Sequence, residues 1–440
     1  MRVKRLSIKG FRGIDQMILE FDADEPTVLI GINGVGKSSI LDCISILLSW
    51  FTGRIQTQSN SATVPEKSGR PFKNEDITNK DRETHNEIDI LHEDQKVTWS
   101  LTKARNGDPS SKLTELETFV EKIHSQLNED PQFNLPVMIF YAVNRVVLDI
   151  PLRIRKQHSF EPIFRAAIDT YDGALESGEI DFRIFFEWFR NQEDIENENK
   201  LELLRQQENE KEIEYHIIKY RDVQLEAVRK AIYLLIPEFL NLRVRCSPVR
   251  MNLEKEGEEL IVNQLSDGEK CLLAMVGDLA RRLAIANPGL SDPLQGKGVV
   301  LIDEIELHLH PKWQREIIPA LTRTFPNCQF IVTTHSPQVV SHIKPQGIYI
   351  LEKTDNGIVA KRPSSSFGLD SNRILEDLMD VPERPQDIKD DLLELFRLID
   401  KGDINGAKEL RQQLAAEIGE DEPEFVSADV LIRRREILNR

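Results

Sequence analysis

The sequence has no hydrophobic run long enough to cross a membrane. Its 440 residues contain no stretch that approaches the roughly 18 apolar residues required for a membrane-spanning helix. The N-terminal segment MRVKRLSIKGFRGI alternates apolar and basic side chains and lacks the apolar centre of a signal peptide. We therefore expect a cytoplasmic protein that has no membrane partner.

Cysteine is scarce, and its four residues are spaced too far apart for the common metal-binding and redox motifs. They lie at Cys43, Cys246, Cys271 and Cys328, so no C-x-x-C pair or zinc-finger spacing is present. We expect buried thiols in a reducing compartment, and reactive thiols are the alternative.

Basic residues are outnumbered, because 57 Lys and Arg face 74 Asp and Glu and give a formal net charge of −17. A surface that coats nucleic acid without sequence preference needs an excess of Lys and Arg, so this balance argues against such a protein. A local strip at Arg145, Arg153, Arg155 and Lys156 could still contact DNA, and an ordinary charged face is the alternative. The hydrophobic share of 40% is typical of a globular chain with a real core.

A glycine-rich loop at residues 31–38 carries the first motif with chemical meaning. The segment GINGVGKS matches G-x-x-x-x-G-K-[ST] and lies between an apolar strand at 27–30 and a helix that starts at Ser38. Glycines let backbone N–H groups approach phosphates, and the helix N-terminus adds positive potential. We expect Lys37 to contact the β- and γ-phosphates of ATP and the Ser38 hydroxyl to bind Mg²⁺. The nucleotide contacts predicted from this loop are Asn33, Gly34, Gly36, Lys37, Ser38 and Ser39.

A second motif is an apolar strand that ends in two carboxylates. Residues 299–302 read Val-Val-Leu-Ile and precede Asp303 and Glu304, as in a Walker B motif. Asp303 is then expected to hold Mg²⁺, and Glu304 is expected to act in catalysis by polarising the attacking water. The alternative is a carboxylate pair that only caps the end of a strand.

Two loop segments, one before and one after this strand, offer further groups for phosphate binding. The segment NQLSDGEK at 263–270 opens a helix, and TTHS at 333–336 follows another apolar strand. We predict that Ser266 and Gly268 offer hydrogen-bond donors. His335 follows a strand just beyond the carboxylate pair in chain order, which favours a role in phosphate binding. A buried core histidine is the alternative for His335.

Two histidines follow the carboxylate pair in the segment ELHLHP at 306–311. His308 and His310 could form a metal pair. No third ligand has a persuasive spacing, so we prefer a structural role for both.

The order of these motifs resembles the ATP-binding cassette (ABC) heads of the SMC, RecF and OLD groups. The segment at 263–270 resembles the ABC signature, with Asp267 in place of its usual second glycine, 306–311 resembles the D-loop, and His335 matches the switch histidine. Four runs also resemble bacterial AAA-type ATPases of the PtuA kind, which belong to Septu anti-phage defence and to retrons. These runs are QLSDGEKCLLAMVGDLARRLAIANP, VVLIDEIELHLHPKWQREIIPALTRTFPNCQFIVTTHSPQVVS, FFEWFRNQEDIENE and FYAVNR.

This resemblance implies an α/β fold, namely a P-loop NTPase of the ABC-ATPase head type with a mixed sheet and flanking helices. We expect an N-terminal ATPase lobe at 1–157, a helical insertion or arm at 158–245, a C-terminal ATPase lobe at 246–369 and a helical tail at 370–440. The insertion is too polar to build a core and too short for a long coiled coil.

The resemblance also implies a homodimer through the ATP sites, with a higher oligomer as the alternative. In ABC heads the signature of one subunit covers the nucleotide held by the other, so Ser266 and Gly268 would complete the partner's site. The second subunit would exclude water from the γ-phosphate and supply donors where charge develops. Arg12, in the KGFRGI turn, is expected to approach the nucleotide as N-terminal residues do in SMC-like heads. A convincing Q-loop glutamine is absent, and Asn144 or Arg145 stands in that region.

The function implied by the resemblance is that of an ATP-hydrolysing regulatory subunit in an anti-phage defence complex. It would control a separate HNH nuclease, dock that nuclease through the tail or the insertion, and meet nucleic acid through the complex. No Glu plus Asp-x-Asp cluster follows His342, so we expect no nuclease activity of its own. The alternatives are a RecF/SMC-like DNA-repair ATPase, which the acidic charge disfavours, and a transporter subunit, which is ordinarily shorter.

Overall fold

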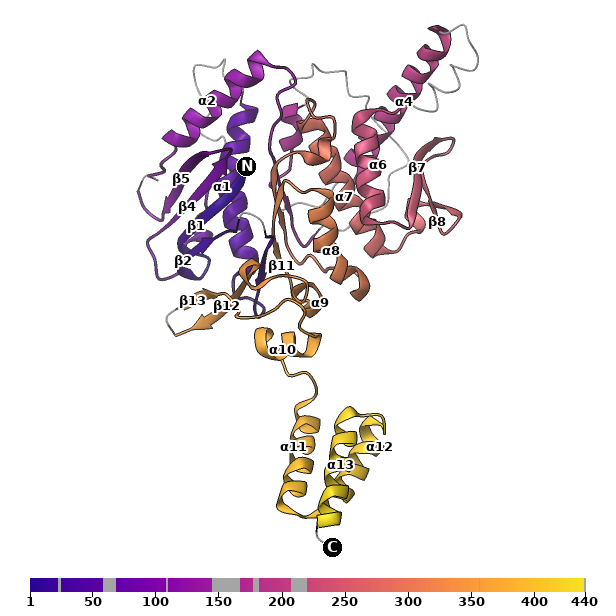
Figure 1. The fold of residues 1–440 in the computed structure, drawn as a ribbon. Helices are drawn as coiled ribbons and strands as arrows, with labels where there is room; N and C mark the ends of the chain where they lie inside the picture. The colour runs from indigo at the N-terminus through magenta and orange to yellow at the C-terminus, as the bar shows by residue number, and fades with distance from the viewer. Residues whose placement is uncertain are drawn as a thin grey trace. The chain divides into compact units, whose positions relative to one another are not determined.

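The chain divides into two compact units in the computed structural model, Met1–Leu369 and Asp370–Arg440 (Figure 1). The expected basic strip from Arg145 to Lys156 lies outside the described residues, as does the expected boundary between residues 157 and 158. The structure describes residues 1–22, 25–57, 69–107, 110–144, 167–176, 182–206, 220–355 and 357–438.

A mixed sheet forms the centre of the larger unit. Its strands are β3 (Thr27–Ile30), β6 (Val137–Tyr141), β10 (Gly298–Ile302), β11 (Cys328–Thr333), β12 (Ile348–Thr354) and β13 (Gly357–Lys361). They lie in the order β13-β12-β3-β11-β10-β6, and all neighbours are parallel except the edge strand β13. Every residue of β3, β6, β10 and β11 is buried, as expected for parallel strands that are covered on both faces. This mixed sheet with flanking helices confirms the predicted fold class.

An antiparallel sheet lies beside the central sheet, and helix α1 (Lys37–Gln56) contacts strands of both (Figure 1). The antiparallel strands are β1 (Arg2–Phe11), β2 (Ile14–Glu20), β4 (Glu83–His92) and β5 (Gln95–Ala104), in the order β2-β1-β4-β5. Buried Trp99 of β5 donates from Nε1 to the Leu47 carbonyl oxygen of α1 at 3.0 Å. Helix α2 (Thr114–Glu129) packs on β5 and α1. The helix that follows the phosphate loop is therefore fixed on two sides.

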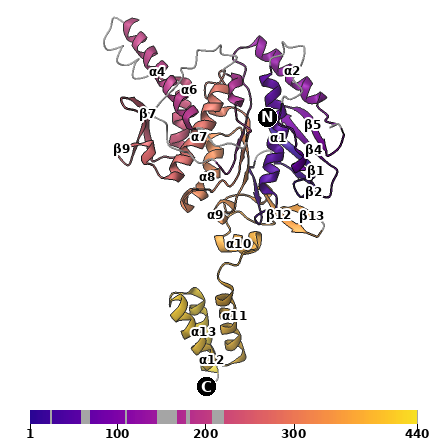
Figure 2. The ribbon, with the colours of Figure 1, turned by 180° about the vertical axis from the view of Figure 1, so that it is seen from behind.

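A group of helices lies on the other side of the central strands (Figure 2). These helices are α4 (Phe182–Gln206), α6 (Val223–Leu235), α7 (Asp267–Ala286), α8 (Pro311–Thr324) and α9 (Pro337–Val340). The first half of α4 buries Phe182, Phe185, Phe186 and Phe189, whereas its polar second half extends away from the unit. The 3-10 turns are η1 (Asn74–Asp76), η2 (Asp169–Tyr171), η3 (Val262–Gln264), η4 (Pro293–Gln295) and η5 (Pro345–Gly347).

The structure corrects the expectation that the helical insertion reaches residue 245. Residues 239–245 instead form most of strand β7 (Phe239–Cys246), which pairs with β8 (Val249–Lys255); β8 pairs with β9 (Glu258–Ile261). The physical reason is a two-residue alternation that a helix cannot use. Arg243 and Arg245 point to one face and donate to the Glu259 carboxylate of β9 at 2.9 and 3.3 Å.

The smaller unit has its own hydrophobic core and confirms the predicted helical tail. Its helices are α10 (Ser371–Met379), α11 (Gln386–Lys401), α12 (Ile404–Ile418) and α13 (Pro423–Leu438). Gly402 ends α11 with a φ of 85°, a conformation that side chains other than glycine rarely adopt. Apolar residues of α11, α12 and α13 fill the core, including Leu392, Leu395, Ile399, Leu414, Phe425 and Ile432.

Across the described part of the chain, the helices are too short or too polar to traverse a lipid bilayer.

We predict that Leu395→Ala destabilises the smaller unit by about 2–5 kcal/mol, because it deletes a fully buried side chain. Hydrogen exchange on the full chain should show loss of amide protection in residues 386–438 and retained protection in residues 1–369. Leu393→Ala, on the same helix but 55% exposed, is the matched control and should change stability by less than about 0.5 kcal/mol. Equal effects of the two variants would contradict this description of the core.

Candidate functional site

The phosphate loop connects β3 to α1, and its shape depends on glycine. Gly34 and Gly36 have φ values of 74° and 103°, in the left-handed region. At Gly31, with a φ of 144°, an added Cβ would lie 2.5 Å from the Leu351 carbonyl oxygen of β12. The loop therefore fits tightly against the sheet at one end, while its exposed part, including Asn33 and Gly34, opens to solvent.

Lys37 begins α1, and its side chain folds back over the loop. Its Nζ donates to the carbonyl oxygens of Gly31 at 2.8 Å and Ile32 at 3.0 Å. Burial lowers the pKa of the Lys37 ammonium, and the nearby carboxylates, including Asp303 and Glu304, oppose that shift. The two loop carbonyls therefore hold the Lys37 ammonium over the turn that is predicted to bind phosphate.

Asp303 receives hydrogen bonds from two different elements. Its Oδ1 accepts from the Ser38 hydroxyl of α1 at 3.1 Å and from the Thr333 hydroxyl at the end of β11 at 2.6 Å. Because β10 and β11 run parallel and in register, their carboxyl ends meet at the edge of the sheet where α1 begins. A hydroxyl and a carboxylate oxygen side by side are ligands that Mg²⁺ prefers, so Ser38 and Asp303 fit the predicted ion.

Glu304 is held in a conformation that is rare for its residue type. Its φ is 48°, and its N–H donates to the Thr333 hydroxyl at 2.7 Å. The next N–H, that of Ile305, donates to the Thr333 carbonyl oxygen at 3.0 Å. Strain of this kind persists where neighbouring groups fix it and is common at functional sites. The role of Thr333 was not predicted, although the segment TTHS was.

Glu306 is a second residue that the sequence did not identify. Its carboxylate accepts hydrogen bonds from the Thr334 hydroxyl at 2.7 Å and from the backbone N–H of His335. The imidazole of His335 is left exposed at the end of β11. Glu306 thereby ties the segment that resembles a D-loop to the segment that resembles a switch.

Ser266 and Gly268 lie at the start of α7. The Ser266 hydroxyl accepts from the Glu269 N–H, and the Glu269 carboxylate accepts from the Ser266 N–H at 2.9 Å, which is a capping box. An added Cβ at Gly268 would lie 2.2 Å from the His308 carbonyl oxygen. The segment that resembles a signature therefore packs directly on the segment that resembles a D-loop.

Arg12 lies in the turn between β1 and β2, close to the phosphate loop. Ile14, the first residue of β2, would lie 3.4 Å from a Cβ added at Gly36. Arg12 donates to Asp76 at 2.6 Å and to Asp42, which is one helical turn after Ser38. Both of these partners are carboxylates of the chain itself, so the expected contact between Arg12 and a nucleotide stays a prediction.

His310 has the structural role expected for it, because its Nδ1 accepts from the Lys312 N–H at 3.3 Å and caps α8. Within the ranges that the structure describes, no three His, Cys, Asp or Glu side chains cluster as a metal site. Arg145, one of the two residues that stand where a Q-loop is expected, lies outside the described residues.

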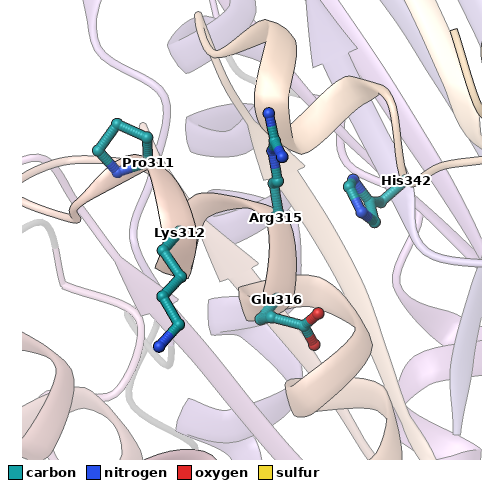
Figure 3. A pocket seen from close by; sticks show the side chains of 5 residues that line it. All are labelled: Pro311, Lys312, Arg315, Glu316 and His342. Atoms are coloured by element: carbon teal, nitrogen blue, oxygen red, sulfur yellow. The ribbon is translucent and has the colours of Figure 1, made fainter. Parts of the chain in front are cut away.

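A separate pocket lies between α8 and the end of α9 (Figure 3). It is lined by Pro311, Lys312, Arg315, Glu316 and His342. None of the residues predicted to bind nucleotide or metal lines this pocket.

Comparisons with known proteins identify the family. Residues 27–341 match the family described as "AAA domain, putative AbiEii toxin, Type IV TA system". The chain is 31% identical to "Retron Ec83 probable ATPase" of Escherichia coli, with 99% of this chain and 87% of that protein aligned. It is 23% identical to "Septu protein PtuA" of Bacillus thuringiensis, over 87% of this chain and 85% of that one.

Among solved structures, an "SMC head domain from Thermotoga maritima" aligns with 83% of this chain and 100% of that chain, at 15% identity and a TM-score of 0.43. The family match covers more than half of the chain, and the Escherichia coli relative aligns with 99% of this chain. The chain therefore belongs to this AAA-domain family and is an AAA-type ATPase that resembles the retron and Septu ATPases.

Proposed function

We propose that the chain binds ATP with Mg²⁺ at the edge of the sheet and hydrolyses it. The observation that carries the proposal is the convergence of α1, β10 and β11 on one carboxylate, with Ser38 and Thr333 both bonded to Asp303. Lys37 exchanges its two loop carbonyls for the β- and γ-phosphates. Backbone and side-chain donors of the loop surround the phosphate chain; they come from Asn33, Gly34, Gly36, Ser38 and Ser39.

Two groups act on the reaction itself. Glu304 is fixed at its backbone and directs its carboxylate to the attacking water, while His335 donates to the γ-phosphate from its exposed position. Mg²⁺ supplies charge neutralisation at the phosphates when it is bound between Ser38 and Asp303.

A second copy of the chain completes each site. Ser266 is exposed and rigidly capped, and Gly268 packs on the neighbouring loop, so this turn is fixed at the surface that another molecule would meet. The Ser266 hydroxyl, which donates to the Glu269 carboxylate at 2.7 Å, exchanges this acceptor for the partner's γ-phosphate. Such donors stabilise charge that develops on the γ-phosphate and exclude water from it. The active state is then a homodimer with two nucleotides at its interface.

We predict that Glu304→Gln binds ATP but loses at least about 100-fold in turnover, because the amide cannot act as a general base. It should accumulate as an ATP-dependent dimer in light-scattering measurements. Lys37→Ala is the paired variant, and it should fail to bind ATP and stay monomeric. Wild-type turnover by Glu304→Gln would show that the assignment of the Walker B carboxylates is wrong.

A substitution at Gly268 separates dimer closure from nucleotide binding. Gly268→Ala places a Cβ against the His308 carbonyl and must displace the turn, so we expect turnover to fall about 100-fold while ATP binding to the monomer persists. Gly406→Ala is a matched control, since its Cβ would lie 2.6 Å from Asp403 in the smaller unit. Unchanged turnover in Gly268→Ala would argue against a role for this turn.

The proposed biological role is regulation of a separate HNH nuclease in anti-phage defence. This role is supported by the similarity to the retron and Septu ATPases. The smaller unit offers a surface for the nuclease, because Val426, Val430 and Ile437 of α13 are 68%, 60% and 73% exposed. Large apolar side chains that share one exposed helix face often mark a protein interface.

Co-expression with an HNH nuclease encoded beside this chain tests the role. The nuclease should co-purify with the ATPase. Val430→Asp should release it without changing ATP turnover, because Val430 is remote in sequence from every predicted ATP-site residue. A monodisperse ATPase preparation that never retains the nuclease would contradict the proposal.

A further inference from the structure

Tyr141 is bonded at its backbone to one predicted site element and at its side chain to another. It is the last residue of β6 and pairs with Ile302 of β10. Its carbonyl oxygen accepts the Asp303 N–H at 2.9 Å. Its hydroxyl donates on the other side to the Asp278 carboxylate of α7 at 3.1 Å, and the Met275 carbonyl is within 3.3 Å. One residue thus connects the metal-binding carboxylate to the helix that begins at the signature turn.

The Asp278 end of this connection is buried and charged. Its two oxygens accept from Arg281 at 2.7 Å and from Arg282 at 2.8 Å. Burial raises the pKa of Asp278, but Arg282 and Arg281 outweigh burial and hold the pKa at about 2. Burial raises the pKa of Tyr141 well above its ordinary value, so the hydroxyl keeps its proton and remains a donor.

The same cluster is anchored to the rest of the unit. Arg282 donates from Nη1 to the Asp172 carbonyl oxygen at 3.0 Å, and the Thr170 hydroxyl donates to the Arg282 carbonyl oxygen at 2.9 Å. The adjacent Gly277 lies so close to Phe185 of α4 that an added Cβ would be 2.8 Å from its ring. Helix α7 is therefore packed and hydrogen-bonded most closely at Gly277 and Asp278, about 17 Å along its axis from Ser266.

We propose that Tyr141 is a positioning residue that couples the two ATP sites of the dimer. The inference rests on the proposed function, in which Asp303 acts at the nucleotide of its own subunit and Ser266 acts at the nucleotide of the partner. Nucleotide binding displaces β10 and, with it, the end of β6. The Tyr141–Asp278 hydrogen bond transmits this displacement to α7. The helix transmits the displacement along its axis to the signature turn, which lies at the opposite site.

The coupling makes ATP turnover cooperative. Binding at one site biases the orientation of the signature turn that completes the other site, which is a coupling free energy between two sites. The Tyr141 hydroxyl is bonded to α7 and not to any residue predicted to bind phosphate. Its removal should therefore leave the ATP affinity of an isolated site intact.

Tyr141→Phe tests this inference, because it removes one hydroxyl and leaves Asp278 paired with two arginines. Tyr171→Phe is the matched control: Tyr171 is also buried, and its hydroxyl donates to the Pro136 carbonyl oxygen at 2.7 Å rather than to a residue of α7. Both variants should unfold at similarly lowered temperatures. We expect Tyr141→Phe alone to lower turnover about 10-fold and to bring the Hill coefficient for ATP close to one, with the affinity for a fluorescent ATP analogue kept within about 2-fold.

The results for these variants and for Glu304→Gln decide the question together. Wild-type turnover and cooperativity in Tyr141→Phe, or equal losses in Tyr171→Phe, would overturn the coupling role. Glu304→Gln with Tyr141 intact reports on the dimer itself. If that variant dimerises with ATP while Tyr141→Phe behaves as wild type, only the coupling fails. If it never dimerises, the proposed head dimer fails, and the coupling fails with it.

Discussion

The carboxylate of Asp303 is the shared acceptor on which the geometry of the site depends. It accepts hydrogen bonds from the Ser38 hydroxyl of α1 and the Thr333 hydroxyl of β11. The backbone N–H of Asp303 donates to the Tyr141 carbonyl oxygen of β6. Because the parallel strands β3, β11, β10 and β6 are adjacent and in register, their ends bring the phosphate loop, the carboxylate pair and TTHS to one place. The sheet therefore brings together groups from three distant parts of the chain, and side-chain hydrogen bonds complete their positioning.

The remaining groups are positioned by contacts between loops rather than by the sheet. Glu306 bonds to Thr334 and to the His335 backbone, and Gly268 packs against the His308 carbonyl. These contacts connect the segments that resemble the signature, the D-loop and the switch within a single subunit. Because the packing between these segments is close, a displacement of one of them requires the others to shift. Helix α7 connects these segments, at its first turn, to the buried cluster at Asp278.

Much of this arrangement could be predicted from local patterns. The loop at 31–38 follows an apolar strand and precedes a helix, and the short apolar run before Asp303 is typical of a buried strand, so both motifs can be predicted from the sequence. The roles of Thr333 and Glu306 could not be predicted, since they depend on which strands are neighbours. Strand β7 was missed because the charged residues before it favour helix, whereas its own two-residue alternation covers only a few positions. The carboxylate partners of Arg12 lie 30 and 64 residues away, beyond the reach of local reasoning.

A structure of the chain with Mg²⁺ and a non-hydrolysable ATP analogue tests the central claim most directly. The account predicts Mg²⁺ within about 2.1 Å of the Ser38 hydroxyl oxygen, with Asp303 beside it directly or through one water. It also predicts a second copy of the chain whose residue Ser266 reaches the γ-phosphate. A nucleotide bound elsewhere, or an ion remote from both Ser38 and Asp303, would contradict the account.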